Sequence, residues 1–244
     1  MTQDQHITVG YLAPYSGNGA FFDNVKPLIP GNITLEIEAL DLVEGTLTSL
    51  VGKEELGVER AQAIFERHPA WQGAVLVGAP VQLYAPGLPG SIRKNASIPV
   101  TTALESSIAG LKALGARRVM LMTPFDGPLN EMVRGFLSER GIESVIGSPP
   151  TADFRTAANV GPDDIYKLVT EGLAQAGEVD AIYFQAAILD PLPVLERMEA
   201  DFKLPIVASA SSMLWHILSL LGQRHPVDGK GGGRLYKEWP ALKD

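Results

Sequence analysis

Short apolar segments alternate with longer segments of helical spacing along the chain. The apolar segments are predicted strands, at residues 6–13, 33–39, 73–77, 98–102, 118–122, 181–184 and 205–208. Several of them are apolar on both faces, as buried parallel strands are. The segments between them are predicted helices, at residues 54–67, 106–114, 129–140, 162–176, 191–202 and 211–221. This alternation predicts an α/β fold with parallel sheets.

The two halves of the chain repeat the same order of segments. AVLVGAP at 74–80 matches AIYFQAA at 181–187, and each is followed by a Pro-led strand, a small polar turn and a helix that ends in Leu-Gly. The offset between these copies is 106 or 107 residues. The apolar strand in VGYLAPYSG at 9–17 also matches that in VMLMTPFDG at 119–127. Matching landmarks in one order favour duplication over the general likeness of α/β units.

Duplication predicts two pseudo-symmetric lobes, each a parallel sheet flanked by helices, with a ligand cleft between them. The first lobe is expected to hold residues 1–115 and 211–244, and the second residues 116–210. In such sheets the ligand binds at the carboxyl ends of the strands. The predicted substrate-binding residues at these ends are Pro14, Gly78, Ala79, Pro80, Phe125, Gln185, Ala186 and Ala187.

Composition narrows the classes of function. The chain has 244 residues, of which 45% are hydrophobic and 20% charged, so it can bury a core without disulfides. Its net charge of −8 argues against nucleic-acid and anionic-membrane partners. No apolar run approaches the roughly 18 residues of a membrane span. The polar start of the chain lacks the apolar stretch of a signal peptide, so we expect a soluble cytoplasmic protein, with homo-oligomers left open.

The chain contains no cysteine, which excludes disulfides, thiolate metal sites and cysteine catalysis. Its four histidines show no metal-ligand spacing, so no metal and no cofactor is predicted. The run GKGGGR at 229–234 lacks the preceding strand and the following Ser or Thr of a phosphate loop. It is predicted to be a flexible loop.

One stretch carries a family resemblance, TTALESSIAGLKALGARRVMLMTPFDGPLNEMVRGFL at 101–137. Its Thr-Pro-aromatic turn is followed by Asn130. Supporting pieces are GAVLVGAPVQLY at 73–84, the strand from Pro205, and GRLY at 233–236. With these motifs the chain resembles the aspartate/glutamate racemase superfamily, in which arylmalonate decarboxylase and maleate isomerase are nearest. The resemblance implies chemistry on a small carboxylate.

The resemblance also implies two cysteine positions that this chain has changed. Racemases of the group use one cysteine from each half, and arylmalonate decarboxylase keeps only the second, as a proton donor. The motifs place these cysteines at Gly78 and Ala186, and the hydroxyls that bind carboxylate at Ala79, Pro80 and Phe125. None of these residues has a titrating group. The two-base and one-base cysteine mechanisms that the resemblance implies are therefore excluded as written.

Three other side chains are candidate acids or bases, each with a structural alternative. Glu105 is either a replacement base or a first-turn residue stabilised by its helix. Asp126 is either a base or a cap of the next helix. Tyr15 is either a hydrogen-bond donor to substrate or an aromatic wall of the cleft. His216 is expected to be packed rather than catalytic.

Backbone groups at the second turn are further candidates. The N–H groups of Ala186 and Ala187 and the amide of Gln185 are placed to hold a carboxylate. The alternative is a tight turn of small residues that serves close packing.

The sequence leaves two main functions from different classes open, together with a third alternative. The first is a cysteine-free enzyme acting on a small carboxylate or dicarboxylate, with decarboxylase, lyase or isomerase chemistry and a substitute acid or base. The second is a non-catalytic carboxylate-binding pseudoenzyme; a purely structural domain is a third. A cleft lined by Tyr15, Gln185 and Glu105 would favour the enzyme. A cleft filled by Phe125, Tyr183 and Leu83 would favour the pseudoenzyme.

Overall fold

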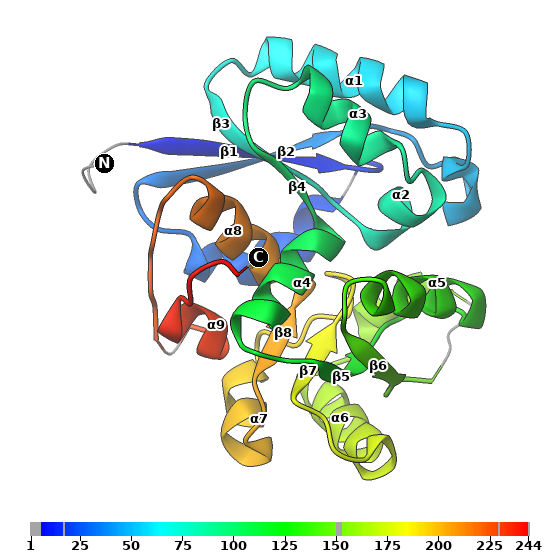
Figure 1. Cartoon of the computed structure of the whole chain (residues 1–244), viewed down its shortest axis with the longest axis vertical. Coiled ribbons are helices and arrows are strands. Elements are labelled where there is room, and N and C mark those ends of the chain that lie inside the picture. The colour runs from blue at the N-terminus through cyan, green and yellow to red at the C-terminus, as the bar shows by residue number, and fades with distance from the viewer. Residues whose placement is uncertain (1–5, 17, 150–152, 229, 244) are drawn as a thin grey trace.

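Two four-stranded parallel sheets form the framework of the molecule (Figure 1). The computed structural model describes residues 6–16, 18–149, 153–228 and 230–243. The first sheet contains β1 Ile7–Ala13, β2 Ile33–Ala39, β3 Trp71–Leu76 and β4 Val100–Thr102. The second contains β5 Arg118–Met122, β6 Glu143–Ile146, β7 Ala181–Phe184 and β8 Ile206–Ala208. The predicted α/β fold is therefore confirmed. Residues 1–5, Gly17 and Gly229, on which parts of the sequence argument fall, lie outside the described residues.

The two sheets share one strand order. The first runs β2-β1-β3-β4 and the second β6-β5-β7-β8, and every neighbouring pair is parallel. Each sheet therefore places its first strand between its second and third. This common order is what the internal repeat predicts, and it puts the carboxyl ends of matching strands in equivalent places.

The helices of the described residues are α1 Glu54–Arg67, α2 Ala79–Tyr84, α3 Leu88–Asn95, α4 Ala103–Ala113, α5 Gly127–Ser138, α6 Pro162–Ala176, α7 Leu195–Phe202, α8 Ser209–Leu220 and α9 Gly233–Glu238. Six of them fall close to predicted positions, whereas α2, α3 and α9 were not predicted. Helix α9 takes in the last two residues of the 229–234 run, so the loop prediction is wrong there. Three 3₁₀ segments, which the sequence did not indicate, are η1 Asn18–Leu28, η2 Leu47–Leu50 and η3 Phe154–Asn159. Helix α7 begins later than predicted because two prolines precede it, and proline donates no backbone hydrogen bond.

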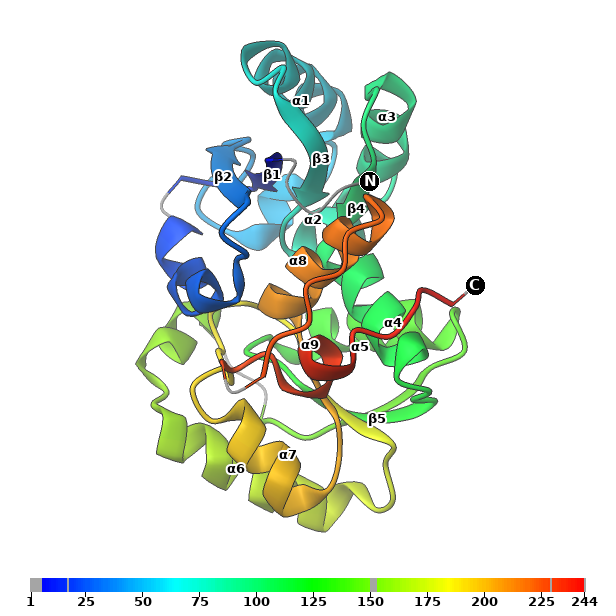
Figure 2. The same cartoon turned by 90° about the vertical axis from the view of Figure 1, so that its left-hand side faces the viewer.

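The helices α4 and α8 lie between the two sheets (Figure 1, Figure 2). Although α4 follows a strand of the first sheet, its Leu104 and Ile108 belong to a core cluster with Val119 and Val207 of the second. Helix α8 makes the reciprocal crossing and contacts β3 and β4. Each half of the chain thus covers a face of the other half's sheet.

Small residues allow these crossings. A Cβ atom at Gly73 in β3 would lie 2.8 Å from Cδ1 of Ile217 in α8, so only glycine admits this helix without a shift. Where α4 meets α8, the hydroxyls of Ser107 and Ser212 are 3.0 Å apart. The division into lobes at residues 115/116 and 210/211 remains a proposal, because both halves contribute to the shared layer of helices.

The outer faces of the sheets are covered by the remaining long helices. Helices α1 and α3 lie at one end of the molecule and α6 and α7 at the other (Figure 1, Figure 2). No helix in the described ranges combines the length and apolar character that crossing a membrane requires. The carboxyl ends of the strands are left for the loops and short helices that form the site.

Candidate functional site

A pocket lies where the strand-end turns of the two halves meet. Its lining residues are Pro14, Tyr15, Phe22, Leu47, Leu50, Val77, Gly78, Ala79, Pro80, Phe125, Phe154, Gln185, Ala186, Ala187, Ile188, Ser209 and Met213. The cavity lined by these residues has a volume of ≈ 70 Å³. All eight residues predicted to bind substrate are brought together here, and so is Tyr15. Their binding roles stay predictions, but their common location follows from the parallel strand ends.

The first turn, between β3 and α2, offers little polarity. Gly78 has φ 91° and ψ 123°, a conformation that glycine adopts without steric cost. A Cβ atom there would meet nothing nearer than 3.8 Å, so the backbone angle, not crowding, calls for glycine. Ala79 and Pro80 then start α2, and Pro80 has no N–H to donate.

The second turn, after β7, has similar geometry with a different residue. Ala186 has φ 97°, in a region that side chains with a Cβ atom rarely occupy. Such a conformation typically costs about 1–3 kcal/mol and is found most often at functional sites. Within the described ranges, no backbone acceptor is assigned to the N–H groups of Ala186 or Ala187. These two groups are therefore available to an anionic or carbonyl oxygen.

Gln185 precedes this strained residue and is wholly buried. Its backbone N–H donates to the Met122 carbonyl at 2.9 Å, which fixes the end of β7 to β5. Its Oε1 accepts a hydrogen bond from the hydroxyl of Tyr183. Its Nε2 is buried and has no partner among the described residues. Burying an amide N–H without an acceptor typically costs about 1–3 kcal/mol of stability. A ligand oxygen that accepts from Nε2 would remove this cost.

Tyr15 is the titratable side chain on the pocket wall. Burial raises the pKa of Tyr15, and the positive charge of Arg155 partly opposes that rise. The phenol is therefore protonated at neutral pH, as an acid must be before it gives up a proton. Phe22, Phe125 and Phe154 complete an aromatic wall around it.

Eight lining residues were not predicted from the sequence. They are Phe22, Leu47, Leu50, Phe154, Ser209, Val77, Ile188 and Met213. The first four belong to the 3₁₀ segments, which have no strand-end signal. Ser209 follows β8 directly and is only 3% exposed. Extending the strand-end rule to that fourth strand would have found it.

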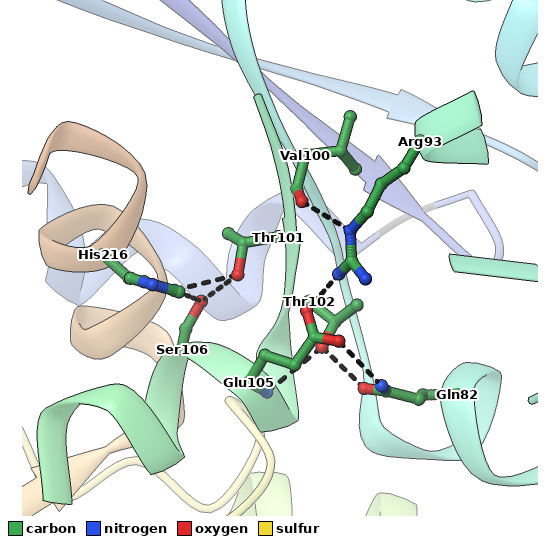
Figure 3. A network of polar contacts seen from close by, with 8 residues as sticks. All are labelled: Gln82, Arg93, Val100, Thr101, Thr102, Glu105, Ser106 and His216. Atoms are coloured by element: carbon green, nitrogen blue, oxygen red, sulfur yellow. Dashed lines mark hydrogen bonds and ion pairs between the residues drawn. The ribbon is translucent and has the colours of Figure 1, made fainter. Parts of the chain in front are cut away.

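Glu105 lies in a polar network outside the pocket lining (Figure 3). Its N–H donates to Oγ1 of Thr102 at 3.1 Å, so Thr102 caps α4. Its carboxylate pairs with Arg93 and accepts from Nε2 of Gln82 at 3.2 Å. This arrangement is that of the structural alternative, a first-turn carboxylate held by its surroundings. Its role as a base stays a prediction that the pocket geometry does not favour.

The same network reaches α8 through His216 (Figure 3). Its Nδ1 lies 2.9 Å from Oγ1 of Thr101 and 3.2 Å from Oγ of Ser106. Burial, with a smaller contribution from the charge of Arg93, lowers the pKa of His216 to about 4. The imidazole is therefore neutral at physiological pH and joins the two halves by hydrogen bonds alone.

Asp126 caps α5 and is exposed. Its Oδ1 accepts from the N–H of Leu129 at 2.9 Å. It lines a neighbouring depression with Tyr84 and Arg155, separated from the pocket by shared residues such as Phe125. Its role as a base also stays a prediction.

The Thr-Pro-aromatic turn is held by buried polar contacts. Nδ2 of Asn130 donates to the Phe125 carbonyl at 3.1 Å, and the hydroxyl of Thr123 donates to Oδ1 of the same asparagine. These bonds fix Phe125 at the pocket wall. In the part of the chain that the structure describes, no three His, Asp or Glu side chains are grouped to hold a metal ion.

Comparison with known proteins agrees with this geometry. The family model described as arylmalonate decarboxylase matches residues 82–236. The maleate isomerase of Nocardia farcinica is 30% identical over 146 residues, which are 59% of this chain and 56% of that protein. The arylmalonate decarboxylase of Bordetella bronchiseptica is 27% identical over 149 residues, 61% of this chain and 62% of that protein. The matched region thus spans less than two thirds of either relative.

Solved structures show the fold over nearly the whole chain. The maleate isomerase from Pseudomonas putida S16 aligns with a TM-score of 0.77 at 21% identity, covering 94% of this chain and 98% of that one. An arylmalonate decarboxylase aligns with a TM-score of 0.74 at 23% identity, covering 95% and 99%. At these identities the likeness establishes the α/β fold alone.

Proposed function

The chain belongs to the arylmalonate decarboxylase family, and from that premise we propose that it decarboxylates a small carboxylate with an apolar substituent. One observation carries the proposal. Within the described residues, Nε2 of Gln185 and the N–H groups of Ala186 and Ala187 have no assigned acceptor, and all three residues line a pocket whose other walls are mostly apolar. The second turn thus combines one side-chain donor with two backbone donors.

The donors suit the charge that decarboxylation creates. When the bond between Cα and the departing carboxylate breaks, its electron pair passes into the remaining carbonyl or carboxylate group. The oxygen of that group gains negative charge, and Nε2 of Gln185 with the two backbone N–H groups can stabilise it. Loss of one such donor typically costs about a hundredfold to a thousandfold in rate.

The apolar walls of the pocket favour departure of the carboxylate as CO₂. A carboxylate placed against Phe22, Val77 and Met213 loses hydration, because these side chains offer it no hydrogen bond. Its charge leaves that environment when neutral CO₂ is formed. The apolar walls therefore favour loss of CO₂ over retention of the charged group.

The proton then comes from Tyr15. Its hydroxyl gives a proton to Cα, and the phenolate that remains lies within the field of Arg155. Because Tyr15 is only partly buried, water can restore its proton. This sequence needs one acid and neither a base nor a thiol nucleophile. The described lining residues include no Asp, Glu, His or Lys, so decarboxylation is favoured over racemisation.

The test is release of CO₂ from 2-methylmalonate and 2-phenylmalonate, followed in D₂O. We expect one deuteron at Cα of the product and a kcat for Tyr15→Phe that is lower by about a hundredfold or more. Tyr166→Phe is the matched control, since its hydroxyl on α6 bonds Asp201 outside the pocket, and it should keep full activity.

Three outcomes would contradict the proposal or part of it. Absence of CO₂ release by the wild type would refute decarboxylation of these substrates. If the malonates nevertheless raised the unfolding temperature, the pseudoenzyme would be the better description. Saturating ligand at about 100 times its Kd should add about 2.7 kcal/mol of stability. Full activity of Tyr15→Phe would assign the acid to another group.

A further inference from the structure

Behind the pocket, a buried tyrosine contacts Gln185, whose side-chain amide is the only one among the described lining residues. Tyr183 lies on β7 with its ring in the core cluster shared with α4, and it is wholly buried. Its hydroxyl donates to Oε1 of Gln185. Burial raises the pKa of Tyr183, so its hydroxyl is protonated and able to donate at neutral pH. The packed ring of Tyr183 thus fixes the position of this donor.

An amide can present either of its ends to a ligand. With Oε1 of Gln185 occupied by Tyr183, the end left without a partner among the described residues is Nε2, a donor. Rotating the amide by half a turn would exchange the two ends. The pocket would then present a carbonyl oxygen, which repels a carboxylate and accepts from an N–H group.

We infer that Tyr183 is a positioning residue: by occupying Oε1 of Gln185 it keeps the amide N–H groups toward the ligand, so that the pocket selects a carboxylate over the corresponding primary amide. The inference rests on the proposed function for the chemistry of the ligand. It adds a residue that touches no ligand and sets specificity through another.

The test compares the Kd values of isobutyrate and isobutyramide by calorimetry, two probes of nearly equal shape. The wild type should prefer the carboxylate. In Tyr183→Phe the preference should fall by about tenfold or more, because a hydrogen bond to a charged group is lost or reversed. A merely structural role would weaken both probes equally and leave their ratio unchanged.

Two further variants make the test specific. Tyr11→Phe removes another wholly buried hydroxyl, one without a partner in the described ranges, and should leave the ratio unchanged. Gln185→Met removes the amide while keeping the length of the side chain. In that background Tyr183→Phe should change the ratio no further, because its effect passes through the amide.

An unchanged ratio in a folded Tyr183→Phe protein would overturn the inference while leaving the proposed function intact. The proposed function is tested separately by CO₂ release, and if the wild type bound neither probe, the orientation of the Gln185 amide would be measured without ligand. The side-chain carbonyl carbon of Gln185 should then shift in the NMR spectrum on Tyr183→Phe. Absence of that shift would overturn the inference independently.

Discussion

The two turns that face each other across the pocket share a backbone and differ in chemistry. Gly78 and Ala186 have φ of 91° and 97° at matching strand ends. The first turn continues into Ala79 and Pro80, which offer no side-chain donor. The second follows Gln185, whose Nε2 has no partner among the described residues. The two turns thus share a backbone shape, whereas a side-chain donor without a partner is found at the second turn.

Two glutamines show the same division between the halves. Gln82 has both ends of its amide bonded, since Oε1 accepts from Thr102 at 2.6 Å and Nε2 donates to Glu105 at 3.2 Å. Gln185 has only Oε1 bonded within the described residues. The first half uses its polar groups to hold itself together, whereas the second leaves one free at the pocket.

The largest expected effect concerns the network of the first half, which His216 of α8 completes. Its folded pKa is about 4, below its ordinary value of 6.5, so the unfolded chain binds more protons between these values. The stabilising contribution is present above pH 6.5 and is lost as the pH falls toward 4. The total loss is about 3 kcal/mol, and it should appear in urea unfolding measured across this range.

The matched variant for that prediction is His216→Asn, which keeps an amide near Thr101 and Ser106 but does not titrate. The carboxylates of the protein titrate in both proteins, so the difference between the two pH profiles isolates the histidine. Parallel profiles from pH 7 to pH 4 would show that His216 does not set the acid stability of the network.

The next effect separates the two glutamines. Gln185→Leu should weaken carboxylate binding by about tenfold or more while the free energy of unfolding changes little, because removal of the unpaired Nε2 offsets the loss of the acceptor of Tyr183. Gln82→Leu should lower the free energy of unfolding by about 1–3 kcal/mol and leave affinity unchanged, because Thr102 and Glu105 lose partners. Calorimetry and urea unfolding measure the two quantities. If Gln185→Leu lowered the free energy of unfolding and Gln82→Leu weakened carboxylate binding, the division between the two glutamines would be contradicted.

A smaller effect is expected from adding a donor to the first turn. Ala79→Ser places a hydroxyl on the pocket wall opposite Gln185, and one hydrogen bond of about 1 kcal/mol should raise carboxylate affinity by about fivefold. Val81→Thr adds a hydroxyl to the same helix outside the lining and should leave affinity unchanged. Equal gains from both variants would mean that the added hydroxyl does not act in the pocket.

The smallest effect concerns the backbone of the two turns themselves. Gly78→Ala introduces a Cβ atom at φ 91° and should lower the free energy of unfolding by about 1 kcal/mol. Ala186→Gly should raise it by about 1 kcal/mol, since relief of strain exceeds the entropy that glycine adds to the unfolded chain. Urea unfolding of both variants checks the opposite signs; shifts of the same sign would refute the strain at Ala186.

Most strands were predictable because a buried strand must be apolar over its length. Strand β6 was not predicted. It is an edge strand that pairs only with β5, and its Glu143 forms an ion pair with Arg118 at 3.0 Å. An edge strand needs apolar residues on fewer sides, so the short sequence ESVI carries little signal.

Some residues of the site were likewise predictable from the sequence, and others were not. Residues that directly follow strands could be located, because the ends of parallel strands converge at one edge of a sheet. Phe22 and Phe154 could not, since 3₁₀ segments fix no register toward the sheet. Glu105 could be placed at a helix start, but the direction of its carboxylate depends on Arg93, which only the packing of α3 brings near.

The sequence by itself determined the α/β repeat, the absence of a thiol, and the small residues at both turns. Only the tertiary structure decided that Ala186 shares the positive φ of Gly78, because alanine alone favours negative φ and the turn is fixed by hydrogen bonds from Gln185 to Met122 and from Leu189 to Ala186. It also decided which end of the Gln185 amide is bonded within the described residues. That choice depends on a hydrogen bond from Tyr183, and no pattern of apolar and polar residues encodes the direction of an amide.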